Sequence, residues 1–264
     1  APSPPGFATF DSSTRNYTIN GGGTGIGAAA DQFNFTSRAM TGGGVVTALL
    51  DAASLGATGK AALMIRGNLT GGAVFASVGV TSSGLSFDWR TTANAAASSS
   101  TVAGINGPVW LRLSQQGNSF AASYSSNGST FTQVGSTQSI AVPSATTLAG
   151  LAVTSGSAGS LASATFSSLS IPQIGWTVAD VGPTGVTGSA MFDPPSNTHT
   201  QAGGGAGIGG IADSFSFLSR SMAGDGNVAT YINAFDAIDI DAKAGVMIRA
   251  NMSADAPFAG IFIT

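Results

Sequence analysis

An internal repeat constrains this chain more than any other feature of its sequence. Residues 60–81 (KAALMIRGNLTGGAVFASVGVT) return near the end as residues 243–264 (KAGVMIRANMSADAPFAGIFIT). Upstream, residues 21–44 return as residues 203–226 with a shift of 182 positions, and one extra residue before Lys243 restores the alignment. Each copy places short apolar runs on either side of a polar turn, which is typical of strands joined by loops. The chain is therefore predicted to contain a duplicated β unit.

The remaining sequence shows strand periodicity and little helical periodicity. Short runs alternate apolar residues with Ser or Thr, and Gly, Asn or Pro bounds them. The predicted strands are residues 7–10, 17–19, 32–39, 44–51, 61–66, 74–81, 85–90, 109–115, 119–125, 131–137, 147–153 and 161–171. Many short strands at this spacing predict an all-β fold of tandem two-sheet jelly-roll sandwiches, the second of them incomplete.

A break in the pattern predicts the domain organisation. Pro172 removes a ladder donor and Gly175 loosens the chain, so one sandwich is expected to end here. Residues 1–172 are predicted to form a complete or nearly complete sandwich. Residues 173–175 are predicted to be a short linker, and residues 176–264 the first half of a second, homologous sandwich.

The alignment of the two copies indicates that each sandwich lacks a part that the other has. Residues 176–182 (WTVADVG) have no counterpart before Ala1, so the first sandwich is expected to lack an opening strand. The counterpart of residues 82–171 is missing after Thr264, so the second is expected to stop about halfway. Half a sandwich has open sheet edges. The expected partners are therefore neighbouring repeats of a longer chain or other copies of this chain, and the sequence leaves both open.

Composition excludes several classes of function. Nine basic and twelve acidic residues give a net charge of −3, so no basic stripe is available for nucleic acid. The absence of cysteine and the single histidine exclude a zinc site and a histidine-based triad. No apolar stretch approaches the roughly 20 residues that span a bilayer. A cysteine-free chain of this size fits an extracellular or cell-surface location.

Charged residues are scarce, so their recurrence indicates specific contacts. The recurring charges are Asp31, Arg38, Lys60 and Arg66 in the first copy, and Asp213, Arg220, Lys243 and Arg249 in the second. We favour a structural interpretation, in which the aspartate accepts hydrogen bonds from loop amides. The arginine fork would bind carbonyls or a carboxylate across the sheets. A role in ligand binding is the alternative.

Aromatic residues on the later strands of the first copy form a candidate carbohydrate platform. Sugar rings stack on aromatic faces, and the candidates are Trp89, Arg90, Trp110, Arg112 and Tyr124. Core packing of each tryptophan is the alternative, and strand alternation would then place its arginine neighbour in solvent.

An acidic segment of the second copy is a candidate calcium site. Asp236, Asp239 and Asp241 lie in the segment DAIDID, and calcium prefers several carboxylate and carbonyl oxygens. The counterpart in the first copy, residues 54–59, carries no acid, so the alternative is a solvated loop. No other cofactor is expected.

Several segments together resemble a known family. AALMIRGNLT, AGVMIRANMS, LSFDWRTTA, VWLRLSQQGNSFAASYSSNGSTFTQVG and LAGLAVTSGSAGSLASATFSSLSI are similar to strings in bacterial concanavalin A-like, laminin-G-like jelly-roll modules. The resemblance covers nearly all of residues 1–171 and the first half of a second module. It implies a non-catalytic accessory domain of a secreted glycosidase or a repeat of a long cell-surface protein.

Two functions follow as hypotheses. The first is a non-catalytic extracellular structural or adhesive repeat, because core residues recur and no reactive cluster recurs with them. The alternative is a carbohydrate-binding accessory module of a secreted glycosidase. A catalytic role ranks third, since it would require a pair of carboxylates in one cleft.

Overall fold

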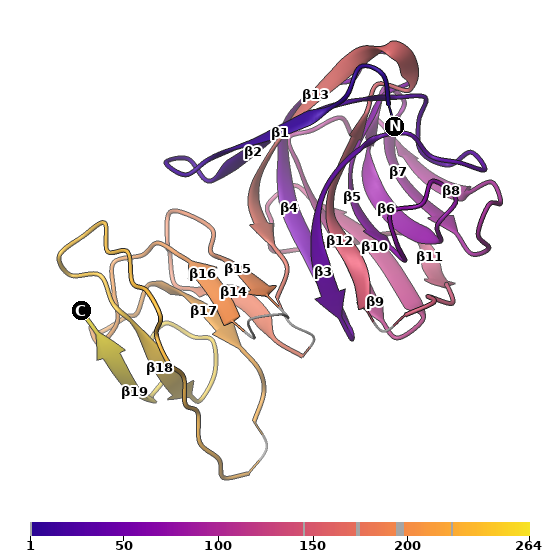
Figure 1. Ribbon diagram of the computed structural model, residues 1–264. Helices are drawn as coiled ribbons and strands as arrows, with labels where there is room; N and C mark the ends of the chain where they lie inside the picture. Colours follow the sequence, from indigo (N-terminus) through magenta and orange to yellow (C-terminus); the bar gives the residue numbers. More distant parts are fainter. Residues whose placement is uncertain (1, 145, 173–174, 194–197, 223) are drawn as a thin grey trace. The chain divides into compact units, whose positions relative to one another are not determined.

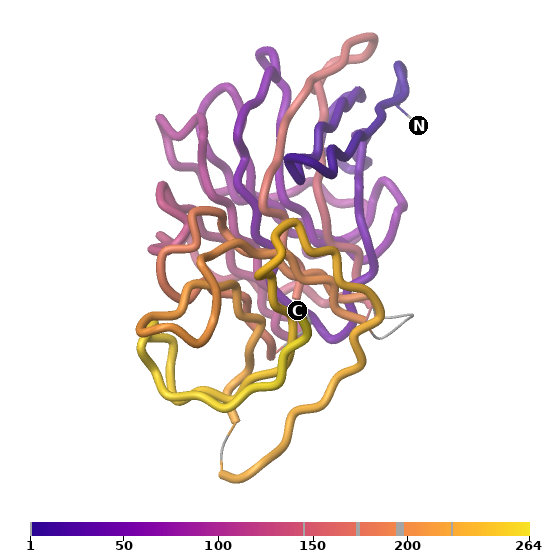
Figure 2. The backbone as a smooth tube through the Cα atoms, turned by 90° about the vertical axis from the view of Figure 1, so that its left-hand side faces the viewer, coloured from indigo at the N-terminus to yellow at the C-terminus, as the bar shows by residue number. Residues whose placement is uncertain are grey.

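The computed structural model describes residues 2–144, 146–172, 175–193, 198–222 and 224–264. Within these ranges the chain forms strands, turns and irregular loops and no helix, so none that could cross a membrane (Figures 1 and 2). The chain divides into two compact units: unit 1 comprises residues 1–174 and 191–199, and unit 2 comprises residues 175–190 and 200–264. Residues 191–199 thus group with unit 1, although the repeat aligns them with the second copy.

Unit 1 contains two large antiparallel sheets. The seven-stranded sheet has the order β1-β2-β13-β4-β9-β10-β11, and the six-stranded sheet has the order β3-β12-β5-β6-β7-β8. The bounds of the first set are β1 Phe7–Asp11, β2 Asn16–Gly23, β4 Gly43–Ser54, β9 Val109–Gln116, β10 Ser119–Ser125, β11 Thr132–Ser139 and β13 Ser157–Ser170. Those of the second are β3 Asn34–Thr41, β5 Lys60–Arg66, β6 Phe75–Thr81, β7 Gly84–Arg90, β8 Ser98–Ala103 and β12 Thr146–Thr154.

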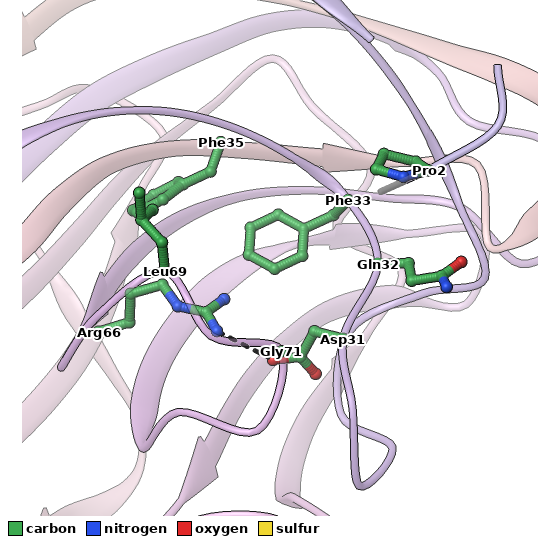
Figure 3. Close-up of a pocket in the computed structure, with 8 residues that line it drawn as sticks. All are labelled: Pro2, Asp31, Gln32, Phe33, Phe35, Arg66, Leu69 and Gly71. Atoms are coloured by element: carbon green, nitrogen blue, oxygen red, sulfur yellow. Dashed lines mark ion pairs between the residues drawn. The ribbon is translucent and has the colours of Figure 1, made fainter. Parts of the chain in front are cut away.

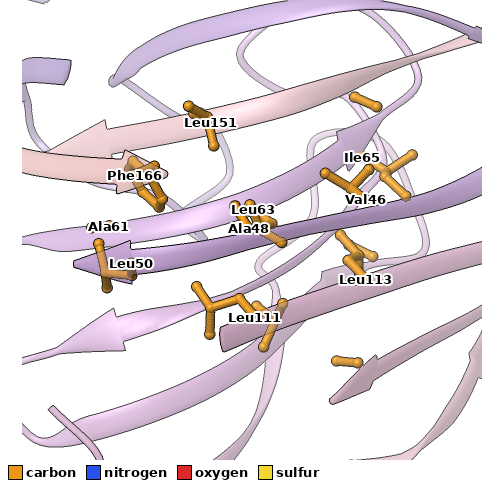
Figure 4. Close-up of a cluster of buried hydrophobic side chains, with 14 of the residues drawn as sticks. Val46, Ala48, Leu50, Ala61, Leu63, Ile65, Leu111, Leu113, Leu151 and Phe166 are labelled. Atoms are coloured by element: carbon orange, nitrogen blue, oxygen red, sulfur yellow. The ribbon is translucent and has the colours of Figure 1, made fainter. Parts of the chain in front are cut away.

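The main hydrophobic core lies between these two sheets. Along β9 buried and half-buried residues alternate, which places Leu111 and Leu113 in the core with Leu63 and Ile65 of β5 (Figure 4). Burial of one such side chain contributes about 1.5–3 kcal/mol. The all-β prediction is confirmed, and unit 1 is a two-sheet sandwich.

The six-stranded sheet is also covered on the face that points away from this core, which we call the outer face. All residues of β5 are buried, so its two faces are both covered. On the outer face Met64, Phe75 and Ala152 form a second cluster, packed against Phe33 and Phe35. The outer face therefore combines apolar packing with the charged residues described below.

Close packing of neighbouring strands limits the size of side chains on the outer face. A methyl group at Gly79 of β6 would overlap the carbonyl oxygen of Ala61 and the Cβ atom of Ala62 on β5. We expect Gly79→Ala to lower the free energy of unfolding by about 1–3 kcal/mol, because the strands must separate. Chemical denaturation measures this. Gly210→Ala is the control, since the nearest atom lies 3.7 Å from its added methyl group, and an equal effect of both substitutions would contradict the prediction.

Each strand predicted within residues 1–172 coincides with a strand of the structure, and the turn at Gly117 joins β9 to β10 as expected. The prediction missed β8. Its sequence SSSTVA lacks apolar alternation, and most of its residues are exposed. This strand forms because its backbone pairs with β7, although β8 has no buried face of its own.

The second copy reproduces the strand pairs of the first where both partners are present. The strands are β14 Thr177–Val181, β15 Ser189–Asp193, β16 Thr198–Ala202, β17 Phe215–Ser219, β18 Ala244–Arg249 and β19 Phe258–Ile263. They form three two-stranded sheets, β14-β17, β15-β16 and β18-β19. By alignment β17 is the counterpart of β3, and β18 and β19 are the counterparts of β5 and β6.

One segment of the second copy differs in structure from its counterpart. Residues 226–237 align with β4 but form no strand, and nearly all of them are exposed. In unit 1, β4 lies between β13 and β9. Among the described residues, no strand pairs with residues 226–237.

Candidate functional site

A buried carboxylate with two arginines occupies the outer face of the six-stranded sheet. Asp31 precedes β3, Arg66 ends β5 and Arg90 ends β7, and we call these three residues the Asp31 cluster. The side chains of Asp31 and Arg90 are 0% exposed. Alternation along β5 and β7 directs both arginines away from the core, because Ile65 and Trp89 pack on the core side.

Arg90 forms the closest contact of the Asp31 cluster. Its Nη1 donates to Asp31 Oδ2 at 2.9 Å and its Nη2 donates to Asp31 Oδ1 at 2.7 Å. The guanidinium also lies over the Phe75 ring, 4.9 Å from its centroid. Its remaining contacts are to backbone carbonyls, those of Ala28, Gly71, Ala73 and Ala95. Such a bidentate pair fixes both partners in one geometry.

Arg66 completes the Asp31 cluster at a longer distance. Its Nη2 lies 3.6 Å from Asp31 Oδ2 and donates to the carbonyl of Thr70 at 2.5 Å. Its Nε donates to the carbonyl of Asn68 at 2.7 Å, so the arginine also holds the β5–β6 loop. Burial lowers the pKa of Arg66, and Asp31 opposes that shift. Both arginines thus bind carbonyls and a carboxylate, the arrangement that we favour from the sequence for the recurring charges.

The second copy repeats part of this arrangement. Arg249 Nη1 donates to Asp213 Oδ2 at 3.1 Å, and its Nε donates to the carbonyl of Asn251 at 2.7 Å. Asp213 accepts a hydrogen bond from Gly209 N at 2.8 Å, as Asp31 does from Gly27 N at 2.9 Å. The position of Arg90 has no counterpart within the sequence.

A small pocket lies beside the Asp31 cluster in unit 1. Its volume is about 230 Å³. It is lined by Pro2, Asp31, Gln32, Phe33, Phe35, Arg66, Leu69 and Gly71. Figure 3 shows the Phe33 ring in the middle, with Leu69 and Arg66 on one side and Pro2 and Gln32 on the other. Leu69 is 72% exposed, so an apolar side chain borders the pocket at the surface.

The aromatic wall of this pocket recurs in the second copy with the same geometry. The ring centroids of Phe33 and Phe35 are 5.8 Å apart at 56°, and those of Phe215 and Phe217 are 5.7 Å apart at 55°. Arg66 lies 5.0 Å from the Phe33 centroid, and Arg249 lies 5.2 Å from the Phe215 centroid. Each arginine, held by its aspartate, therefore fixes one ring of the pair.

A buried lysine lies on the same outer face as the Asp31 cluster. Lys60 Nζ forms an ion pair with Asp88 and donates to Ser86 Oγ at 3.0 Å. Burial lowers the pKa of Lys60 to about 7. The recurring Lys243 differs, since it is exposed and donates to the carbonyl of Ile208 at 3.0 Å.

The structure does not bring the predicted aromatic platform together. Trp89 and Tyr124 pack against the core. Trp110 and Arg112 lie on the opposite face of the seven-stranded sheet, where the Arg112 guanidinium lies 3.5 Å from the Phe131 centroid. Burial lowers the pKa of Arg112. The expectation that Arg90 lies in solvent is wrong, because its partner Asp31 is buried beneath the loops.

The other predicted charged residues also lie apart from the pocket. Arg38 pairs with Asp193 at 3.2 Å and not with Asp31, because alternation along β3 turns it from the outer face. Arg220 is exposed, and its guanidinium lies 5.9 Å from the Trp176 centroid.

The acidic segment of the second copy forms a turn in the structure. Asp236, Asp239 and Asp241 are exposed, and Asp239 Oδ1 accepts a hydrogen bond from the amide of Asp241 at 2.9 Å. Within the described part of the chain, no group of three or more His, Cys, Asp or Glu residues is arranged to hold a metal ion.

Sequence reasoning missed Phe33, Phe35 and Leu69 as pocket residues. The available signal was the repeated motif Asp-x-Phe-x-Phe, in which the two phenylalanines recur as faithfully as the aspartate. It also missed Arg90 as a partner of Asp31, because 59 positions separate them along the chain.

Comparison with solved structures finds a chain with a similar fold. No family model matches the chain, and no curated protein is similar to it in sequence. A protein of unknown function from Saccharomyces cerevisiae superposes with a TM-score of 0.50 and 16% identity, over 66% of this chain and 98% of that chain. The two chains share a fold.

Weaker similarity extends to parts of larger enzymes. The GH43 protein BlXynB from Bacillus licheniformis gives a TM-score of 0.45 at 15% identity, over 61% of this chain and 35% of that chain. Xylan β-1,4-xylosidase from Bacillus halodurans C-125 gives 0.44 at 12% identity, over 61% of this chain and 34% of that chain. The match spans about a third of the length of these enzymes.

Proposed function

We propose that this chain is a non-catalytic carbohydrate-binding protein built from concanavalin A-like jelly-roll modules. In each module a pair of phenylalanines beside an arginine binds one sugar ring. The observation that carries this proposal is the aromatic pair, which has the same ring separation and angle in both copies. Because one chain carries two such aromatic pairs, it would bind a repeating polymer with avidity.

The chemistry of the pocket suits a sugar ring. The apolar C–H face of a sugar stacks on an aromatic ring, and Phe33 and Phe35 offer such faces beside the exposed Leu69. Gln32 lines the same pocket with an amide that can bond to hydroxyl groups. A volume of about 230 Å³ is smaller than most pockets for drug-sized ligands, so it suits a single ring.

The single carboxylate of the pocket lining supports a non-catalytic role. Glycosidases use two carboxyl groups, one of which must exchange a proton. Asp31 is the one carboxylate among the residues that line the pocket. Both of its oxygens accept hydrogen bonds from Arg90, so this carboxylate is fixed in one geometry by a buried arginine.

A structural or adhesive role in an extracellular array is the second candidate. The observation that favours it is the ion pair of Asp213 with Arg249, which repeats that of Asp31 with Arg66. An ion pair that recurs in each module would stabilise the same fold in successive modules. A cell-surface location is part of both proposals.

Removal of the aromatic wall tests carbohydrate binding. We expect Phe33→Ala and Phe35→Ala to weaken retention on a polysaccharide at least about fivefold, since loss of one stacking contact costs about 1 kcal/mol or more. Affinity electrophoresis against a panel of plant, fungal and bacterial polysaccharides measures this effect.

Leu161→Ala is the matched control, because Leu161 is an exposed apolar residue of β13, outside the pocket. The proposal fails if the wild-type chain is retained on no polysaccharide of the panel. It also fails if Leu161→Ala weakens retention as much as the two phenylalanine substitutions do.

A further inference from the structure

One edge of β3 lacks a neighbouring strand in unit 1. Within the described residues, β3 is the terminal strand of the six-stranded sheet and pairs only with β12. We propose that this free edge accepts a strand in trans, and that the strand is the β14 segment of another molecule of this chain. The surface is an interaction site separate from the pocket.

The second copy shows which strand the free edge fits. There β17, the counterpart of β3, pairs with β14 in an antiparallel ladder of five residues (Figure 1). The two acceptor strands share the pattern Phe-x-Phe-x-Ser, as FNFTS in residues 33–37 and FSFLS in residues 215–219. The ladder of β14 thus has a second acceptor of nearly the same sequence.

The direction of the backbone carbonyls shows that β14 uses the edge that is free in β3. Successive carbonyls along a strand point to opposite edges. The carbonyl of Thr36 faces β12, because a methyl group at Gly150 of β12 would overlap it. The carbonyl of Ser37 therefore faces the free edge. In the second copy its counterpart, the carbonyl of Ser219, accepts a hydrogen bond from Thr177 Oγ1 of β14 at 3.4 Å.

Each copy of the strand therefore uses a different edge. β3 uses the edge that binds β12, and β17 uses the edge that binds β14. The sequence of β3 contains no proline, so its free edge can form a complete ladder. An open edge of this kind is a template for strand addition.

The register of the added strand follows from the second copy. There Thr177 lies opposite Ser219 and Val181 lies opposite Phe215. Transfer by 182 positions places Thr177 opposite Ser37 and Val181 opposite Phe33. Both Thr177 and Ser37 are exposed, so cysteines at these positions report the pairing without disturbing the core.

Two cross-linking experiments test the proposal, and the chain suits them because it contains no cysteine. In the first, full-length Ser37→Cys is incubated with a synthetic peptide of residues 175–183 that carries cysteine at position 177. We expect a disulfide that links peptide to chain. The matched control peptide carries cysteine at position 178, whose side chain points to the other face of the strand, and its yield should be at least tenfold lower.

The second experiment tests whether another molecule of this chain donates the strand. Chains with Ser37→Cys alone are mixed with chains with Thr177→Cys alone, and mixed dimers are detected by mass. We expect their yield to rise with protein concentration and to exceed that of Ser37→Cys mixed with Val178→Cys. Circular dichroism of each variant checks that it is folded.

Every outcome decides the proposal. Equal yields from both peptides, or no linkage to either, would show that β3 does not accept this strand in register. Linkage of the peptide without mixed dimers would overturn the proposal that another molecule of this chain supplies the strand.

Discussion

Arg90→Met is expected to lower the free energy of unfolding of unit 1 by about 3–5 kcal/mol, because it leaves the buried carboxylate of Asp31 without its closest partner. Methionine keeps part of the apolar stem but donates no hydrogen bond. Arg66 stays 3.6 Å from the carboxylate and compensates only in part. Urea denaturation measures the change. Tryptophan fluorescence with a Trp176→Phe background reports on unit 1, which holds the other two tryptophans.

Two variants make the Arg90 prediction specific. Arg220→Met removes an exposed arginine and is expected to change stability by less than about 0.5 kcal/mol. The double variant Asp31→Asn with Arg90→Met should cost less than the sum of its two single variants, because it removes the buried charge together with its partner. A loss below about 1 kcal/mol for Arg90→Met would show that Asp31 does not depend on this arginine.

Stability is expected to rise with pH between about 7 and 10.5 because of Lys60. Burial lowers the pKa of its amino group to about 7, whereas the unfolded chain has the ordinary value of 10.5. In this range the unfolded state binds more protons than the folded state, so the free energy of unfolding increases with pH. The slope reaches about 1.4 kcal/mol per pH unit at most. Below pH 7 both states are protonated, and the contribution is constant.

The Lys60 effect has its own control. Lys60→Met should flatten the pH dependence, whereas Lys243→Met should leave it unchanged, since Lys243 is exposed. Asp88→Asn should extend the rise to pH values below 7, because loss of the carboxylate that stabilises the charged amine lowers the folded-state pKa of Lys60 further. A flat profile of the wild-type chain from pH 7 to 10 would contradict the prediction. Denaturation in urea at a series of pH values gives the profile.

Local sequence was sufficient for most strands of unit 1. Alternation of apolar and hydroxyl residues depends on neighbours two positions apart, so it can be read from the sequence. The strand β8 was missed because its ladder with β7, and not its own pattern, makes it a strand. Residues 226–237 align with β4 but form no strand, and no described strand pairs with them, whereas β4 lies between β13 and β9.

The candidate site could be predicted only in part. The recurrence of Asp31 and Arg66 marked them for a shared structural purpose, and both belong to one buried cluster. Arg38 recurs in the same motif, seven positions after Asp31, whereas the closest partner of Asp31 is Arg90. Alternation along β3 sends Arg38 to the other face, so its nearness to Asp31 in sequence does not bring the two side chains together.

The sequence by itself determined that the chain is a duplicated β unit, because repeats and alternation are local properties of the residues. Only the tertiary structure decided what each repeated residue does. Lys60 and Lys243 occupy equivalent positions, but Lys60 is buried against Asp88 and Lys243 is exposed. The environment of a charge depends on strands distant in sequence: β7 supplies Asp88 and Ser86 beside Lys60, whereas Lys243 donates to the carbonyl of Ile208 in a loop.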